Sequence, residues 1–275
     1  MLSDLTDIQV NVLLASIIGD GEITKIYKGS RRKNNSYREH YGKSQEEYRK
    51  WKIGFLPEHL YLTPNSQTVR SASQPLFTNL YTLFYKDNCK QIPSDFLHLC
   101  TYPHFLAILY MDDGSLSISH RVNHRNKKIY LLPHIYLYLQ CYEKNQLVIL
   151  QKHIQYTFDI NLKLSSRKDG SGFILKTTTI AETMKFLNTI NPITKSCPTM
   201  YYKTEWSFRL EYEISKWKNR YCDYEVIVSS SDRYKNYSEE EISTLVKLKR
   251  QGVTDREIAL HHGRTYWSVL YKLSD

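Results

Sequence analysis

The 275-residue sequence lacks the features that would assign it to several common classes of protein. It contains no apolar run of about 18 residues, the length that a membrane-spanning helix requires. Its N-terminus places Asp4 and Asp7 before a short apolar stretch, whereas a signal peptide begins with basic residues. We therefore expect no membrane partner, and a location in the cytoplasm, an organellar matrix or a phage-infected cell.

Cysteine is scarce and scattered. The five cysteines are Cys89, Cys100, Cys141, Cys197 and Cys222. Their number is odd and no two form a CxxC pair, so the sequence offers neither a disulfide framework nor a zinc or redox motif. We expect reduced thiols.

Acidic residues are outnumbered, with 28 Asp and Glu against 38 Lys and Arg, which gives a net charge of +10. A polyanion is the first partner to consider, and an acidic membrane surface the second. Between Lys25 and Lys52, ten basic residues face three Glu. Such a stretch is either a solvated face or a surface that follows phosphates, and we favour the second interpretation. The chain also holds 23 tyrosines, whose flat side chains either fill sheets or lie against sugar and phosphate.

Two short apolar helices each end in an acidic residue followed by glycine. The first is predicted from Thr6 to about Gly19 and ends at Asp20-Gly21. The second, Phe105 to Met111, ends at Asp112-Asp113-Gly114, so that 93 residues separate Asp20 from Asp113. Strands and helices follow each of them in the same order, which predicts a duplicated α+β fold.

The pattern places further elements in both halves. In the first half, helices are predicted at about residues 48–60 and 75–85, with short extended pieces at 67–70 and 74–77. In the second half, the predicted elements are strands at 117–119, 129–140, 162–165 and 172–177 and helices at 144–158 and 180–188. His120 and His124 fall in an expected basic loop, and no acidic third ligand accompanies them, so a zinc site is not indicated.

The acidic helix ends carry the chemistry. An anion at a helix C-terminus is disfavoured by roughly 0.3 to 1 kcal/mol, so something should compensate for it. We expect the following glycine to end each helix in the left-handed conformation. Small residues such as Ala15 and Ala107 would let the two helices approach, which brings Asp20 and Asp113 together. Two such carboxylates repel unless a divalent cation lies between them, and hard oxygen ligands suit Mg²⁺ or Mn²⁺. A single Asp-Gly pair would be interpreted as an ordinary turn. Two such pairs, each after an apolar helix and separated by a whole repeat, favour a functional site instead.

The segments Leu13 to Gly21 and Leu106 to Gly114 resemble the paired motifs of monomeric LAGLIDADG homing endonucleases. The resemblance covers roughly residues 5–215. It implies two pseudo-symmetric αββαββα units whose saddle-shaped antiparallel sheets read the major groove of double-stranded DNA, with Asp20 and Asp113 as the metal ligands. Asp112 is not the family's catalytic position. The implied protein is a monomer that cuts both strands of a long target with Mg²⁺ or Mn²⁺.

The same resemblance implies roles for other polar residues. Lys90 and Lys203 match the spacing of the family's central lysines, which act in catalysis or as plain phosphate contacts. His40 and Gln140 fall near positions that hold the water network. The residues expected to contact DNA are Arg31, Arg32, Lys33, Arg38, Arg121 and Arg125 in the duplicated region, and Arg264 and Lys272 near the C-terminus.

The C-terminal segment follows a different pattern. Ser238 with Glu241 has capping-box spacing, and three short helices are predicted, with Gly263 in the turn before the last. This is typical of a helix-turn-helix unit, and a plain three-helix bundle is the alternative. We therefore predict units at residues 1–98 and 99–222, a linker at 223–236 and a helix-turn-helix domain at 237–275.

Two other functions are compatible with the sequence. Proteins of this fold also serve as RNA maturases, with intron RNA as partner, or as DNA-binding regulators that do not cleave. Retention of both acidic residues and both lysines favours the enzyme, because a pure binding protein would not need them.

Overall fold

The computed structural model describes residues 2–167, 169–228, 237–264 and 266–274, apart from the side chain of Trp267. The chain forms two compact units, a core unit of residues 1–229 and a C-terminal unit of residues 230–275. No described helix is both long and apolar enough to cross a membrane.

The core unit repeats one order of elements. Its first half consists of α1 (Asp7–Ile18), β1 (Glu22–Thr24), β2 (Ser36–His40), α2 (Glu46–Ile53), β3 (Tyr61–Thr63), β4 (Thr68–Arg70) and α3 (Pro75–Phe84). Its second half consists of α4 (Pro103–Asp113), β7 (Gly114–Asn123), β8 (Lys128–Leu137), α5 (Lys144–Phe158), β9 (Lys163–Ser166), β10 (Phe173–Lys176) and α6 (Ile180–Thr194). Both halves are therefore αββαββα.

The two sheets have matching strand orders. The first runs β1-β2-β4-β3, and in the second β7 pairs with β8, which pairs with β10, which pairs with β9. All of these pairs are antiparallel. The predicted α+β fold of two equivalent units is thus confirmed.

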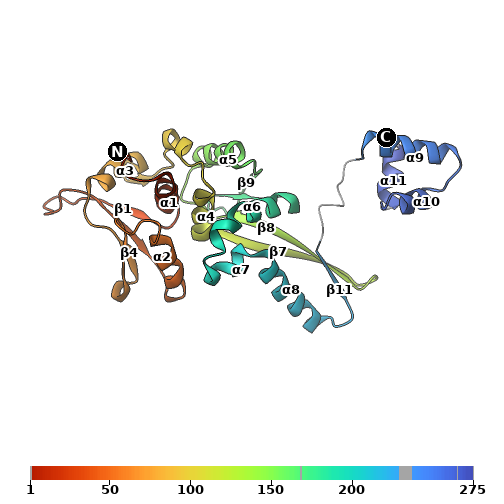
Figure 1. Ribbon diagram of the computed structural model, residues 1–275, viewed down its shortest axis with the longest axis horizontal. Helices are drawn as coiled ribbons and strands as arrows, with labels where there is room; N and C mark the ends of the chain where they lie inside the picture. Colours follow the sequence, from red (N-terminus) through yellow and green to blue (C-terminus); the bar gives the residue numbers. More distant parts are fainter. Residues whose placement is uncertain (1, 168, 229–236, 265, 275) are drawn as a thin grey trace. The chain divides into compact units, whose positions relative to one another are not determined.

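The helices α1 and α4 form the centre of the core unit, with one sheet on either side (Figure 1). Every residue of α1 from Val10 to Ile18 is buried, as is every residue of α4 from Phe105 to Met111. A helix that is apolar all round must be covered on all sides, and these two cover each other. Thr6 begins α1 with a capping box, in which it and Gln9 satisfy each other's backbone N–H groups.

Several elements add to the duplicated plan. They are the hairpin β5 (Tyr85–Lys86) and β6 (Cys89–Lys90), the helices α7 (Tyr201–Thr204) and α8 (Trp206–Arg220), the strand β11 (Glu225–Val228), and the 3₁₀ turns at Lys43–Gln45, Pro64–Ser66, Ser94–Leu99 and Pro198–Met200. The hairpin β5–β6 follows the first half, and α7 follows the second. Each contributes one of the two central lysines.

Sequence reasoning misjudged two parts of the second half. The strand β7 is ten residues long instead of three, so His120 lies in a strand where a loop was expected. Part of the expected linker, Glu225–Val228, is the strand β11, which pairs in parallel with β8. The physical reason is the apolar run Val226-Ile227-Val228, which suits a half-buried strand. Residues 229–236 of that linker lie outside the described residues.

The described residues of the C-terminal unit form three helices, α9 (Glu239–Arg250), α10 (Asp255–His261) and α11 (Tyr266–Ser274). Ser238 and Thr254 begin the first two with capping boxes. The small core is formed by Leu245, Ile258, Ala259 and Val269. Gly263 has a φ of 60°, a conformation that glycine adopts without strain, at the turn before α11.

Candidate active site

The two acidic helix ends meet where α1 and α4 pack together. A side chain at Gly19 would bring its Cβ within 2.8 Å of the Cβ of Asp112. Only glycine permits this approach, because real Cβ atoms do not come so close. The Asp20 and Asp113 carboxylates are near enough for Asp20 to raise the pKa of Asp113. The structure therefore brings together the two residues that the sequence predicted as a pair.

The glycines after the acidic residues act differently from the sequence expectation. Neither Gly21 nor Gly114 has a positive φ, and Gly114 is extended. Instead, a Cβ at Gly21 would collide with the ring of Tyr37, and a Cβ at Gly114 with the ring of Tyr110. The expected left-handed caps are wrong. Glycine is required at both positions because the backbone passes close to a tyrosine side chain where it turns from the motif helix into the following strand.

Asp113 is a carboxylate without a side-chain partner among the described residues. Burial raises its pKa to about 7, and the charges of Asp20 and Asp112 act in the same direction. Lys90 and Lys203 oppose the shift. A half-buried carboxylate that repels its neighbours and receives no side-chain donor is well suited to an external cation.

Each predicted lysine binds the end of one motif helix. Lys90 Nζ donates to the carbonyl oxygens of Gly19 and Gly21 at 2.8 and 2.9 Å, on either side of Asp20. Lys203 Nζ donates to Met111 and Gly114 at 2.5 and 3.1 Å, around Asp113. These ammonium groups provide the compensation that an acidic residue at a helix C-terminus needs.

Lys203 is buried and Lys90 is half-buried. Burial lowers the pKa of Lys90, and it lowers that of Lys203 to about 8. Each ammonium also faces a tyrosine ring at about 6 Å, Lys90 that of Tyr142 and Lys203 that of Tyr110. The two lysines therefore occupy equivalent environments in the two halves.

A buried ionic cluster adjoins the site, and sequence reasoning missed it. Arg49 and Lys52 of α2 contact Glu39 and Asp112, and the side chains of all four are at most 1% exposed. The hydroxyl of Tyr48 also donates to Asp112 at 2.7 Å. Burial raises the pKa of Asp112, but the positive charges of Lys52 and Arg49 outweigh this effect and hold that pKa below its usual value. The prediction that the stretch from Lys25 to Lys52 follows phosphates is wrong for Arg49 and Lys52, whose charges are used inside the protein.

This cluster resembles a cation site but is already filled. Oxygens of Asp20, Glu39 and Asp112 lie within 4.8 Å of one another. The guanidinium of Arg49 and the ammonium of Lys52 contact these oxygens and occupy the place of an ion. Among the described residues, the acidic side chains of this centre that still offer an oxygen without a side-chain donor are Asp20 and Asp113.

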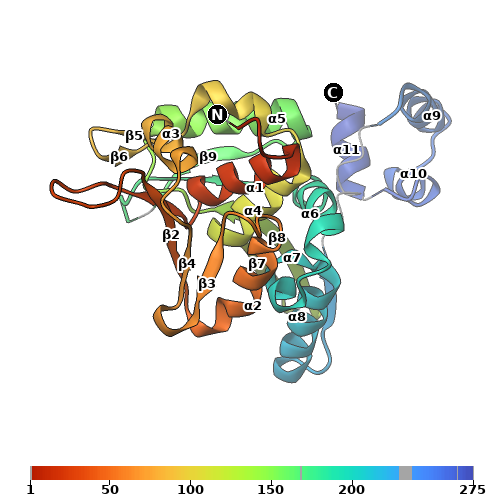
Figure 2. The same cartoon turned by 60° about the vertical axis from the view of Figure 1, so that its left-hand side comes forward.

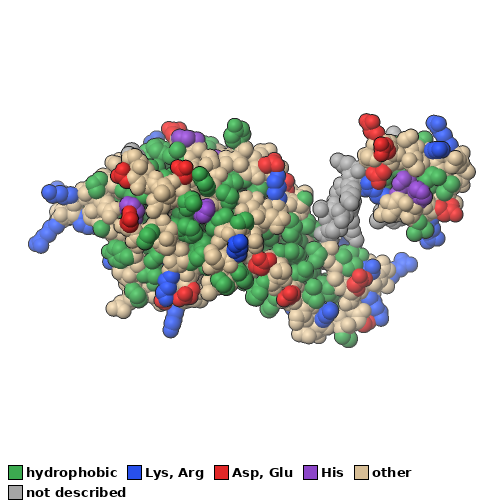
Figure 3. Space-filling view, in the orientation of Figure 1, with side chains coloured by type: hydrophobic (Ala, Val, Ile, Leu, Met, Phe, Trp, Pro, Cys, Tyr) green, Lys and Arg blue, Asp and Glu red, His purple; other side chains and the backbone are tan. Residues whose placement is uncertain are grey.

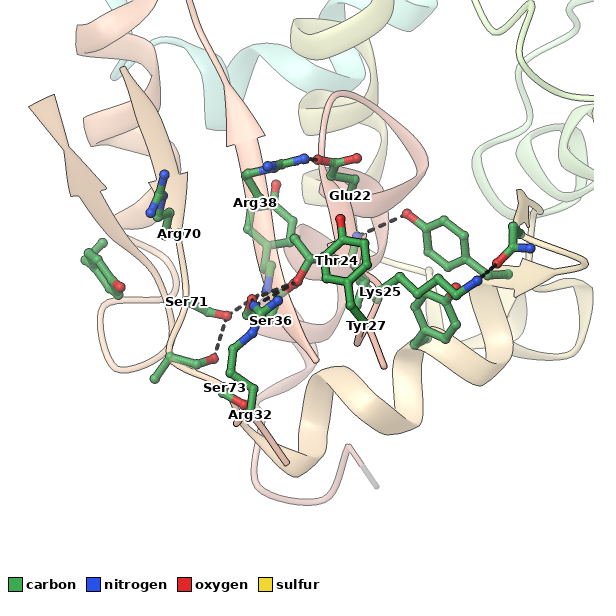
Figure 4. Close-up of a pocket in the computed structure, with 17 residues that line it drawn as sticks. Glu22, Thr24, Lys25, Tyr27, Arg32, Ser36, Arg38, Arg70, Ser71 and Ser73 are labelled. Atoms are coloured by element: carbon green, nitrogen blue, oxygen red, sulfur yellow. Dashed lines mark hydrogen bonds and ion pairs between the residues drawn. The ribbon is translucent and has the colours of Figure 1, made fainter. Parts of the chain in front are cut away.

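The first sheet presents basic side chains on the face opposite its core. Arg38 pairs with Glu22, and Arg32 donates to Thr24 and Ser36, along a hollow of the sheet surface (Figure 4). Arg31 and Lys33 are exposed in the β1–β2 loop, at whose tip Figure 3 shows basic side chains.

In the second half, Arg121 is exposed on β7 and Arg125 in the turn that follows it. The strands of the hairpin β7–β8 are longer than β1 and β2, and these two basic residues lie near its end.

The predicted water-network residues are not counterparts of each other. Glu22 pairs with Arg38 in the first sheet, and its counterpart Ser115 pairs with Tyr136 in the second. Arg38 is therefore equivalent to Tyr136. Two residues further on, His40 is equivalent to Tyr138, and four residues further on, Gly42 is equivalent to Gln140. His40 is exposed and Gln140 half-buried, and their role in holding water stays a prediction.

The C-terminal residues are engaged within their own unit. Arg264 pairs with Glu241 at 2.9 Å and lies over the ring of Tyr237 at 4.3 Å, which joins the loop before α11 to the start of α9. Lys272 is half-buried on α11. Their contact with DNA stays a prediction.

Paired acidic helix ends between two αββαββα halves define the LAGLIDADG fold. The chain belongs to the LAGLIDADG DNA endonuclease family, whose model matches residues 10–185. Among solved structures, the homing endonuclease I-WcaI bound to its DNA recognition sequence is similar, with a TM-score of 0.56 and 21% identity over 73% of this chain and 87% of that one. The I-LtrWI homing endonuclease bound to target DNA has a TM-score of 0.46 and 12% identity, covering 89% of this chain and 97% of that one.

A curated relative, Protein RecA of Mycobacterium shimoidei, is 27% identical over 214 residues, or 74% of this chain. The match covers 48% of that protein, so the chain spans about half the length of the relative.

Proposed function

We propose that this protein is a site-specific homing endonuclease that hydrolyses one phosphodiester bond in each strand of a long double-stranded DNA target. The observation that carries the proposal is the pair of carboxylates at equivalent points of a duplicated fold. Each carboxylate lies beside a lysine that binds the same helix end. A protein that only binds DNA does not need this arrangement.

The proposed cofactor is Mg²⁺ or Mn²⁺, held by Asp20 and Asp113. The donors are hard carboxylate oxygens, and Asp113 receives no side-chain donor from the described residues, so the residues fit such an ion. When bound, the metal activates water and neutralises the charge that develops on the phosphate.

Lys90 and Lys203 are the proposed catalytic cations. An ammonium group has three N–H donors, and each lysine uses two of them on backbone carbonyls. The third can bind a phosphate oxygen whose charge increases in the transition state. Because the backbone bonds fix each Nζ beforehand, this contact would need no reorganisation.

Binding is proposed to involve both sheets. Arg31, Arg32, Lys33 and Arg38 would contact DNA from the first half, and Arg121 and Arg125 from the second. His40 and Gln140 would order water near the scissile phosphates. The C-terminal unit, as a helix-turn-helix, would add contacts beyond the core site.

The test is cleavage of a plasmid that carries the uninterrupted host locus, in Mg²⁺. Asp20→Asn or Asp113→Asn should reduce cleavage by at least about 10³-fold while affinity for the plasmid stays within about threefold. Lys152→Gln, an exposed change on α5, is the matched control and should cut normally. Wild-type rates in both Asn variants would refute the assignment. Binding without cleavage by the unchanged protein would favour the regulator, and splicing of intron RNA would favour the maturase.

A further inference from the structure

The two halves of the acidic centre differ in one buried contact. We propose that Arg49 is a positioning residue that holds Asp20 and competes with a divalent ion there, so that the Asp113 half takes up the ion more tightly. The inference rests on the proposed function, because it assumes that both carboxylates bind metal.

Arg49 bridges three carboxylates. Its Nη2 contacts Asp20 Oδ2 at 2.6 Å, while its Nη1 contacts Glu39 Oε1 at 2.6 Å and Asp112 Oδ1 at 2.7 Å. The Arg49 side chain is only 1% exposed, so its position is set by the protein around it. The Asp20 side chain is 31% exposed, and no described group donates to its other oxygen. Asp20 is therefore fixed at one oxygen and open at the other.

The charges explain why Asp20 is held but not neutralised. Arg49 and Lys52 carry two positive charges, and Glu39 and Asp112 carry two negative ones. The cluster is balanced before Asp20 is counted. Asp20 therefore keeps a charge that attracts a metal ion, but that ion must share the carboxylate with a guanidinium.

The described residues of the second half form no equivalent of this cluster. If Asp20 and Asp113 are counterparts, Gly19 is the counterpart of Asp112, and the strand registers make Leu137 the counterpart of Glu39. Among the described residues, no side chain donates to the Asp113 carboxylate. Its neighbouring cation, Lys203, binds backbone carbonyls instead. The duplicated fold therefore places one restrained and one unrestrained carboxylate in the same centre.

The test is a titration of the full chain with Mn²⁺ at pH 8.5, followed by electron paramagnetic resonance, without DNA. The wild type should show two classes of site whose affinities differ by about tenfold. Asp113→Asn should remove the tighter class, and Asp20→Asn the weaker one. Lys152→Gln, exposed on α5, should leave both unchanged.

Removal of the competing cation provides the decisive variant. The double change Arg49→Gln with Asp112→Asn deletes one positive and one negative charge, which keeps the buried cluster balanced. It should tighten the weaker class by about tenfold, so that the two classes converge. The thermal midpoint of each variant, measured in parallel, shows whether it is folded. A merely structural role for Arg49 would change that midpoint without changing the ratio of the two affinities.

The possible failures are distinguishable. If the folded double variant keeps the wild-type ratio, or if Asp20→Asn removes the tighter class, the role of Arg49 is overturned while the nuclease proposal stands. If Mn²⁺ fails to bind, or if Asp20→Asn with Asp113→Asn leaves both classes in place, the metal assignment and the inference fall together.

Discussion

Asp113, a proposed metal ligand, lowers the free energy of unfolding when its buried carboxylate is ionised. Its pKa of about 7 lies above the value of about 3.9 expected in the unfolded chain, so the folded state binds the proton more tightly. The contribution of this group to the free energy of unfolding is therefore largest below about pH 4. It falls as the pH rises towards 7 and stays low above that.

We predict that Asp113→Asn stabilises the protein at pH 8 by about 1 to 3 kcal/mol in the absence of metal, because it removes a desolvated charge. At pH 5 the gain should be much smaller, since Asp113 is then protonated. Urea unfolding at the two pH values measures the difference. Asp95→Asn, on the surface, is the control. An equal gain at both pH values would contradict the assigned pKa.

Gly19 sets the separation of the motif helices. We predict that Gly19→Ala costs about 1 to 3 kcal/mol, because its Cβ would lie 2.8 Å from that of Asp112 and the helices would have to separate. Gly42→Ala is the matched control, since nothing lies within 4 Å of a Cβ there and φ is −81°. Chemical denaturation compares the two, and an equal cost in both would mean that helix approach is not the reason.

At the scale of elements, the sequence predicted what depends on local pattern. The sequence predicted the motif helices, the helix over Lys144–Phe158 and the capping box at Ser238, because apolar periodicity and capping residues are local signals. The central lysines also came from the sequence, through the family resemblance. They lie at the helix ends, and their catalytic role is still a proposal.

The features that the sequence did not predict depend on contacts between residues far apart in the chain. Burial of Arg49 and Lys52 is possible only because Asp112, about 60 residues away, meets them in the fold. Nothing local separates these two from the exposed basic residues beside them. The helix α8 was overlooked because Trp, Tyr and charged residues alternate through it. Its apolar face becomes recognisable only against the β7–β8 hairpin.

The contact of α8 with that hairpin can be tested through Trp217, which is 4% exposed, packs on Ile129 and Leu131, and lies 4.4 Å from the ring of His120. We predict that Trp217→Ala lowers the free energy of unfolding by about 3 kcal/mol. Phe208→Ala, in the same helix but 51% exposed, should cost less than about 1 kcal/mol. Similar costs for the two would show that α8 does not depend on this contact.

At the scale of the whole molecule, the chain folds into two compact units. The proposed catalytic residues all lie in the core unit, and the helices α9, α10 and α11 of the C-terminal unit (Figure 2) enclose a core of their own. The core unit holds 30 of the 38 basic residues and 21 of the 28 acidic ones, so nearly all of the net charge of +10 lies there, and affinity for DNA should fall steeply with salt.

We predict that removal of residues 230–275 leaves DNA cleavage intact but weakens binding at least about tenfold and flattens the dependence of log Kd on log salt, because phosphate contacts are lost. Fluorescence anisotropy with the target duplex at several salt concentrations measures both. Circular dichroism of the shortened chain verifies that the core unit is folded. Loss of cleavage in a folded core unit would assign the C-terminal unit a part in the reaction.

The strand β11 has a further consequence for the protein in solution. A long hairpin presents unpaired N–H and C=O groups along its sides, and such an edge can recruit a strand from another molecule. By pairing with Lys128–Leu131 of β8, β11 occupies that stretch with a segment of the same chain. The extension of the second sheet is thereby protected on this side against self-association.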